Sequence, residues 1–295
     1  MTTPTIVTAI AEPASRWLNH DVSMRMSAAL NAQSMRVLSP ETAVEFITEH
    51  PQPTKALEGL LPATAPVDIN AQPWRENRRK ALLLADMDST MIRQECIDEL
   101  AAEIGVKDHV AAITKRAMNG EIEFEAALRE RVGLLKGLPV SVIDKVIATR
   151  IELMPGGPEL VRTMRKHGAH CALVSGGFTD FTSRIAEIIG FHENRANQLL
   201  QENGLLTGTV AEPILGKQAK LDTMHRLCER LNLTAEDVLA VGDGANDLAM
   251  IEAAGLGVAL HAKPTVAARA DARINHGDLT ALLYLQGYED NDIVR

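Results

Sequence analysis

The feature that most constrains the fold is an alternation of short apolar runs with helical patterns over the later part of the chain. The apolar runs cover residues 81–85, 171–174, 238–241 and 257–260. They lack polar alternation, which is typical of strands buried on both faces in a parallel sheet. Helical patterns lie between them, at residues 158–167, 180–189 and 221–231. This order of strands and helices predicts an α/β core with a parallel sheet.

Two carboxylates follow the first core run, Asp86 and Asp88, with one residue between them. Alternate residues of an extended segment share a face, so both carboxylates can address one centre. Such a pair serves as metal ligands, as nucleophile plus general acid, or as both. A solvated turn is the plainer alternative. A calcium-binding EF-hand loop is excluded, because Met91 and Ile97 stand where that loop needs glycine and glutamate.

The second core run ends in Ser175, Gly176 and Gly177. A hydroxyl and a flexible backbone in this position could present hydrogen-bond donors to an oxyanion, although a plain turn has the same composition. Lys220 opens the helical pattern at residues 221–231, and its charge could neutralise a phosphoryl group. An exposed surface lysine is the alternative.

The third core run is followed by a loop that contains glycines, Asp243, Asn246 and Asp247. Glycines permit a tight approach of the backbone, and the side chains offer the hard oxygen ligands that magnesium prefers. A calcium loop or a simple turn is the alternative. Because ligands bind at the carboxyl ends of strands in such sheets, the ends of the first three core runs are expected to converge on one site.

Two further intervals differ from the core. Residues 93–153 contain helix-forming, charged and aliphatic residues without a strand-like run, which predicts an all-helical insertion. Residues 62–79 contain prolines and a charged cluster and are interpreted as a linker, which places a domain boundary near residue 78. The segment before the linker favours a small α/β module, with strands at residues 5–9 and 36–38 and helices at 12–32 and 41–49.

Composition narrows the class of protein. The chain has 295 residues, 46% of them hydrophobic and 23% charged, which is typical of globular domains. A net charge of −9 opposes attraction to nucleic acid and to anionic membrane surfaces. No apolar run reaches the roughly 18 residues of a membrane span, and the start lacks the basic region of a signal peptide. Three widely spaced cysteines fit a reducing compartment, so we expect a cytoplasmic protein.

Four motifs have been described: the Asp86 and Asp88 pair, the segment 175–177, Lys220, and the loop with Asp243, Asn246 and Asp247. Taken in order, they resemble the motifs of the haloacid dehalogenase superfamily, and within it those of the phosphoserine phosphatases. Two segments of the helical insertion are also similar to that family, at residues 95–100 and 124–132. The resemblance implies a three-layer Rossmann-like core over residues 79–295, with a helical cap inserted at about 93–153. Bacterial members often carry an ACT-like domain where this chain has residues 1–78, which implies a role in ligand sensing or homodimer formation.

The resemblance also implies the chemistry. Asp86 would be the nucleophile that forms an aspartyl-phosphate, and Asp88 would be the general acid and then the general base. One Mg²⁺ would be held by Asp86, the main-chain carbonyl of Asp88 and Asp243, with Asp247 in support. Splitting the reaction in two replaces the capture of a free water by attack from a carboxylate that is already in place.

The resemblance also implies which groups bind the substrate. The phosphoryl oxygens would be held by Ser175, Gly176 and Lys220. Glu95 would bind the substrate ammonium and Arg131 the substrate carboxylate, for which a guanidinium fork is suited. Phe124 would shield the amino-acid moiety, and Asn246 would also touch the substrate.

These expectations describe a magnesium-dependent phosphatase that converts O-phospho-L-serine to L-serine and phosphate, as the last step of serine biosynthesis. One alternative is an enzyme of the same type that acts on another small phosphomonoester or transfers the phosphoryl group to an acceptor alcohol. Another is a non-catalytic module that senses an amino acid. Against the latter stands the complete acid set, since an idle site has no reason to keep four carboxylates together.

Overall fold

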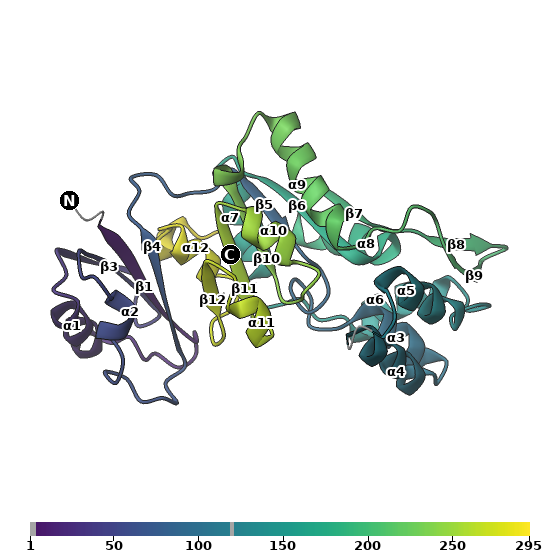
Figure 1. Ribbon diagram of the computed structural model, residues 1–295, viewed down its shortest axis with the longest axis horizontal. Helices are drawn as coiled ribbons and strands as arrows, with labels where there is room; N and C mark the ends of the chain where they lie inside the picture. Colours follow the sequence, from purple (N-terminus) through teal and green to yellow (C-terminus); the bar gives the residue numbers. More distant parts are fainter. Residues whose placement is uncertain (1–3, 119–120) are drawn as a thin grey trace. The chain divides into compact units, whose positions relative to one another are not determined.

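The computed structural model describes residues 4–118 and 121–295 (Figure 1). Within these residues no helix combines the length and the apolar character needed to cross a membrane. The chain divides into two compact units. One comprises the residues up to Leu83 together with Pro155–His170 and Leu233–Arg295, and the other comprises Leu84–Met154 and Cys171–Asn232.

The core strands form a six-stranded sheet with the order β12-β11-β10-β5-β6-β7. Their bounds are β5 Leu82–Ala85, β6 His170–Phe178, β7 Glu193–Asn197, β10 Val238–Gly242, β11 Leu256–Leu260 and β12 Ala272–Ile274. Parallel pairing joins β10 to β11, β11 to β12, and β6 to β7. Every residue of β5, β10 and β11 is buried, which explains why these runs show no polar alternation. The predicted α/β class with a parallel sheet is confirmed.

Helices accompany these strands in each unit. In the unit that contains β6 and β7 they are α8 Thr179–Ile189 and α9 Lys217–Leu231. In the other unit they are α7 Gly157–Lys166, α10 Leu248–Ala253, α11 Pro264–Ala267 and α12 Ala281–Leu285. The predicted helices at 158–167 and 180–189 match α7 and α8 within one residue. Helix α9 begins before the predicted start at residue 221, so Lys220 lies inside the helix.

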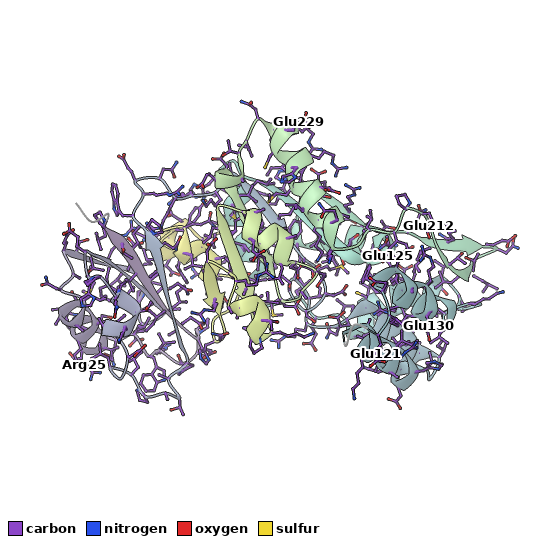
Figure 2. The ribbon with its side chains drawn as sticks, viewed as in Figure 1. Arg25, Glu121, Glu125, Glu130, Glu212 and Glu229 are labelled. Carbon is purple, nitrogen blue, oxygen red and sulfur yellow. The ribbon has the colours of Figure 1, made fainter. Side chains whose placement is uncertain are left out.

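The interval expected to be an all-helical insertion is helical wherever the structure describes a regular element of it. These helices are α3 Cys96–Glu103, α4 Lys107–Met118, α5 Phe124–Gly133 and α6 Ser141–Arg150, which gather in the teal part of the ribbon (Figure 1). The same unit contains a hairpin of β8 Leu199–Glu202 and β9 Leu205–Val210. Arg129 on α5 pairs with Glu212, which follows this hairpin, at 2.7 Å. Glu212 is labelled in Figure 2.

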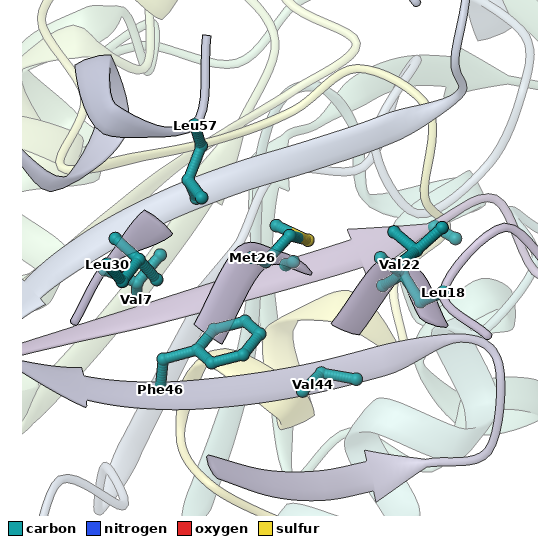
Figure 3. Close-up of a cluster of buried hydrophobic side chains, with 10 residues drawn as sticks. Val7, Leu18, Val22, Met26, Leu30, Val44, Phe46 and Leu57 are labelled. Atoms are coloured by element: carbon teal, nitrogen blue, oxygen red, sulfur yellow. The ribbon is translucent and has the colours of Figure 1, made fainter. Parts of the chain in front are cut away.

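Residues before the core form an antiparallel sheet with the order β2-β3-β1-β4. Its elements follow the chain as β1 Thr5–Ala11, α1 His20–Ala29, β2 Ser34–Ser39, β3 Ala43–Thr48, α2 Pro53–Ala56 and β4 Val67–Pro73. This β-α-β-β-α-β order is the ferredoxin-like arrangement. One face of the sheet packs with α1 around Val7, Met26 and Phe46, which are at most 1% exposed (Figure 3).

Three local predictions for this segment are wrong. Residues 41–49, expected to be helical, contain strand β3, because aromatic and β-branched residues such as Val44, Phe46 and Ile47 pair with β1. The expected helix at 12–32 is confined to His20–Ala29. The expected linker at 62–79 contains strand β4, in which Val67, Ile69 and Ala71 pack against the hydrophobic cluster while the intervening residues are polar.

Two polar residues of β4, Asp68 and Asn70, are buried against β12 and the segment that follows it, within the same unit. Asp68 is 4% exposed, and its carboxylate accepts hydrogen bonds from the backbone amides of Asn275, His276 and Gly277 at 2.8–2.9 Å. Asn70 exchanges two hydrogen bonds with the backbone of Arg273. The alternation that marks a half-exposed strand in sequence therefore serves here to attach the N-terminal sheet to the core.

Replacing Asp68 by alanine is expected to lower the free energy of unfolding by about 3 kcal/mol, because three backbone amides, one of them buried, lose their acceptor. Urea denaturation followed by circular dichroism measures the change. Glu58→Ala, which removes an exposed carboxylate from the same module, is the matched control and should change stability by less than about 0.5 kcal/mol. Equal losses in the two variants would contradict an anchoring role for Asp68.

Candidate active site

Asp86 and Lys220 form a buried ion pair at the end of β5. Asp86 follows the last residue of that strand and is 4% exposed, whereas Lys220 lies in the first turns of α9 and is 2% exposed. Lys220 Nζ lies 2.6 Å from Asp86 Oδ1. A buried carboxylate needs a partner charge, and the Lys220 ammonium supplies it. The structure thus brings together two residues that lie far apart in the sequence.

Asp88 lies two residues further along and is held on both carboxylate oxygens. Its Oδ1 accepts the backbone amide of Cys96 at 3.0 Å, and its Oδ2 accepts the Ser175 hydroxyl at 3.4 Å. Loss of hydration raises the pKa of Asp88, while the hydrogen bonds from Cys96 and the charge of Lys220 act in the opposite direction. A raised pKa favours the protonated form, which is the form that can donate a proton to a leaving group.

Ser175, Gly176 and Gly177 lie beside Asp88, in the irregular last part of β6, which is here called the serine-glycine loop. The Gly177 amide donates to Ser175 Oγ at 2.8 Å. A β-carbon on Gly177 would lie only 2.8 Å from Asp88 Oδ2, so a larger residue would displace this carboxylate. Glycine is therefore needed here for the close approach of the loop to Asp88.

The loop after β10 contributes Asp243 and Asp247. One carboxylate oxygen from each of Asp86, Asp243 and Asp247 lies within 4.8 Å of the others. Asp247 is fully buried, and a β-carbon on Gly242 would lie 2.3 Å from its carboxyl carbon, which accounts for the glycine at the end of the strand. Hard carboxylate oxygens at this spacing can hold a divalent cation, and a shared cation would relieve their mutual repulsion. Asn246 lies in the same loop and is partly exposed.

The cap supplies Glu95, Phe124 and Arg131. Glu95 is exposed at the start of α3, and its Oε1 accepts the Ser89 hydroxyl at 2.8 Å. The Phe124 ring would lie 3.5 Å from a β-carbon on Gly176, so it packs over the serine-glycine loop. Burial lowers the pKa of Arg131, and the negative charges of Glu95, Asp98 and Asp88 oppose that shift. The half-buried guanidinium of Arg131 therefore lies within the electrostatic influence of these acidic groups.

Sequence reasoning missed the role of Cys96. It donates its main-chain amide to Asp88, and its side chain is 1% exposed. A backbone donor has no residue type of its own, so no pattern in the sequence could have indicated it. The nearest signal was the position of Cys96 at the first turn of the predicted helical insertion, since helix N-termini carry amides without intrahelical partners.

These elements define a class of hydrolase. Residues 81–255 match the family model of haloacid dehalogenase-like hydrolases, and the chain belongs to that family. Among solved structures, a haloacid dehalogenase family hydrolase from Salmonella enterica serovar Typhi is similar, with a TM-score of 0.84 and 30% identity over 96% of this chain and 98% of that one.

Within the family the chain belongs with the phosphoserine phosphatases. The phosphoserine phosphatase of Polaromonas sp. is 42% identical over 239 residues, which cover 79% of this chain and 99% of the relative. That of Archaeoglobus fulgidus is 46% identical over 217 residues, or 73% of this chain. The matching part spans 63% of the Archaeoglobus protein's own length.

Proposed function

We propose that the protein hydrolyses O-phospho-L-serine to L-serine and phosphate through an aspartyl-phosphate on Asp86. The observation that carries the proposal is the buried pair of Asp86 and Lys220 with Asp88 and Ser175 beside it. This arrangement provides a carboxylate nucleophile, a cation for the phosphoryl oxygens and a second carboxyl for proton transfer. Relatives that are named phosphoserine phosphatases support the choice of substrate.

In the first half of the reaction, Asp86 attacks phosphorus and the bond from phosphorus to the serine oxygen breaks. Asp88, in its protonated form, gives its proton to that oxygen, so L-serine leaves as the alcohol. The Lys220 ammonium, the Ser175 hydroxyl and the Gly176 amide donate to the phosphoryl oxygens, where negative charge is concentrated in the transition state. Fixed donors cost no reorganisation when the bond breaks.

In the second half, Asp88 has lost its proton and can accept one from a water molecule. That water attacks phosphorus, the bond from phosphorus to Asp86 breaks, and phosphate leaves with the Asp86 carboxylate restored. The Cys96 amide, which binds Asp88 Oδ1, keeps this carboxyl in place for both proton transfers.

The proposed cofactor is Mg²⁺. Asp86, Asp243 and the main-chain carbonyl of Asp88 would hold it, with Asp247 in support, because these groups offer the hard oxygen donors that Mg²⁺ prefers. When bound, the ion offsets the repulsion between the carboxylate nucleophile and an anionic ester.

For substrate recognition, the proposal assigns the substrate carboxylate to Arg131 and the substrate ammonium to Glu95. Phe124 shields the amino-acid moiety from water, and Asn246 contacts the substrate. The placement of Phe124 over Gly176 and the acidic surroundings of Arg131 support this assignment. Arg131 and Glu95 would thus bind the carboxylate and the ammonium, the two charged groups that distinguish phosphoserine from a plain phosphate ester.

The biological setting follows as part of the same proposal. The enzyme would complete serine biosynthesis in the cytoplasm, and the three cysteines, which are present as thiols, fit that compartment. The module of residues 1–78, by analogy with ACT-like domains, would sense an amino acid or form a homodimer. Its β-α-β-β-α-β order supports this analogy, with residues 79–295 as the phosphatase and about 93–153 as its cap. The net charge supports the absence of nucleic-acid and membrane partners.

The experiment that tests the activity is phosphate release from a panel of phosphomonoesters, with Mg²⁺ or with EDTA. Phosphoserine is expected to exceed the other esters in kcat/KM by orders of magnitude, and EDTA is expected to stop turnover. Asp86→Asn protein purified in parallel controls for contaminating phosphatases. A different leading ester would overturn the substrate, and added alcohols that divert phosphate into new esters would indicate transfer rather than hydrolysis.

Arg131→Ala is expected to lower kcat/KM for phosphoserine about 100-fold more than for p-nitrophenyl phosphate, because the latter has no carboxylate for the guanidinium to bind. Steady-state kinetics with both substrates measures the difference. Arg129→Ala, on the same helix but paired with Glu212, is the matched control and should change both substrates by less than about threefold. Equal losses on both substrates in Arg131→Ala would remove the carboxylate assignment.

A further inference from the structure

Asn197 is a buried side chain with no role in the chemistry described above. It is the last residue of β7 and is 2% exposed. Its register partner on β6 is Phe178, but the pairing of the two strands is irregular between Val174 and Phe178. The serine-glycine loop lies in that irregular stretch, so its backbone groups need partners other than the regular ladder of hydrogen bonds.

The Asn197 amide supplies partners to two separate segments. Its Nδ2 donates to the carbonyl of Gly176 at 2.8 Å and to the carbonyl of Leu215 at 3.3 Å. Its Oδ1 accepts the backbone amide of Leu215 at 2.7 Å. One segment carries Ser175 and Gly176, and the other leads directly into α9, which carries Lys220. Asn197 therefore connects the two segments that carry the proposed phosphoryl-binding groups.

The bond to Gly176 has a specific consequence for Ser175. The Gly176 carbonyl and the Gly177 amide belong to one planar peptide group. Asn197 binds the carbonyl end of this peptide, and Ser175 Oγ accepts the amide end at 2.8 Å. Rotation of this peptide would break both hydrogen bonds, so the Asn197 contact also constrains the position of the Ser175 hydroxyl.

We propose that Asn197 is a positioning residue for phosphoryl binding, which fixes the Gly176–Gly177 peptide and the Ser175 hydroxyl relative to the start of α9. The inference rests on the proposed function, because it assigns the phosphoryl oxygens to these groups. Asparagine suits the position because one side chain must both donate to carbonyls and accept from an amide. Aspartate has nearly the same shape but cannot donate to Gly176 or Leu215.

Asn197→Ala is expected to lower kcat/KM about 30-fold for phosphoserine and for p-nitrophenyl phosphate alike, because both substrates present the same phosphoryl group. Inhibition by inorganic phosphate is expected to weaken about 10-fold. Asn194→Ala is the matched control, because Asn194 lies on the same strand and its amide binds Thr182 and Ser183 of α8 instead. The control should lose stability without a change in phosphate inhibition.

Asn197→Asp keeps the shape of the side chain and decides the question if the alanine variant does not fold. It should weaken phosphate inhibition by at least as much, and thermal denaturation shows that the folded protein is assayed. Phosphate inhibition within about twofold of the native value in a folded Asn197 variant, or equal weakening in Asn194→Ala, would overturn the proposal. Failure of the proposed substrate would instead appear in the native protein, as a lack of preference for phosphoserine over p-nitrophenyl phosphate.

Discussion

Replacing Asp86 by asparagine is expected to lower kcat for O-phospho-L-serine by at least about 10⁴-fold, because an amide cannot replace the carboxylate as the group that attacks phosphorus. The fold should be retained. The amide oxygen can still accept the hydrogen bond from Lys220, and loss of one negative charge reduces the repulsion with Asp243 and Asp247. The variant thus separates chemistry from stability.

Steady-state turnover and thermal denaturation of the Asp86→Asn protein check the two halves of this expectation. Asp222→Asn, which removes an exposed carboxylate from the same helix as Lys220, is the matched control and should keep its activity within about twofold. Residual activity of the Asp86 variant above about 1% would refute the nucleophile assignment. Inactive native protein would favour the alternative of a sensing module without turnover.

The core of the fold could be predicted because burial on both faces leaves a direct mark in the sequence. Strands β5, β10 and β11 are uninterrupted apolar runs, and each was placed within a residue of its observed bounds. The proximity of Asp86 and Asp243 followed from the same logic, since these residues come directly after two of these runs. The helices of the cap followed from the absence of any strand-like run.

The N-terminal module shows where such reasoning stops. Strand β3 contains Glu45 among its apolar residues. Glu41 and Glu49 flank the strand, so glutamates recur at intervals of four residues and mimic the period of a helix. Glu45 is 5% exposed because Arg36 and Arg78 pair with it, so its burial depends on residues distant in the sequence. Strand β4 could not be predicted for a similar reason. Its buried polar residues bind a backbone segment that is distant in the sequence, and in the sequence they are indistinguishable from those of an exposed linker.

The role of Asn197 could not be predicted from the local sequence either. Nothing in the local sequence distinguishes it from an exposed turn asparagine, and strand β7 carries Glu193, Asn194 and Arg195, which do not form an apolar run. Its role emerges from three hydrogen bonds to Gly176 and Leu215, which come together only in the folded chain. Residues that act through backbone contacts leave no pattern of residue types, whereas residues that act through their own chemistry do.

Asp88 must serve as an acid in one half of the proposed reaction and as a base in the other. A carboxyl with an ordinary pKa would hold little of the protonated form near neutral pH. Burial raises the pKa of Asp88, while Lys220 and the hydrogen bonds from Cys96 and Ser175 limit that rise. A raised pKa increases the protonated fraction of this carboxyl at a given pH, which favours its role as the acid in the first half of the reaction.

Asp88→Asn is therefore expected to affect two substrates differently. Turnover of phosphoserine should fall about 10³-fold, because the departing serine oxygen receives no proton. With p-nitrophenyl phosphate, whose leaving group departs as a stable anion, Asp86 should still be phosphorylated, but no base remains to activate water. Rapid mixing should then show a burst of about one p-nitrophenol per enzyme followed by slow turnover, which is how an accumulating covalent intermediate appears in kinetics.

The burst distinguishes this role of Asp88 from a purely structural one, because a distorted site would slow phosphorylation of Asp86 with both substrates. Asp86→Asn supplies the control, since a protein without the nucleophile should show no burst at all. Acid quenching of the Asp88 variant should also trap phosphate on the peptide that contains Asp86. Equal losses on both substrates without a burst would mean that Asp88 positions the site rather than moving protons, because only proton transfer depends on the basicity of the leaving group.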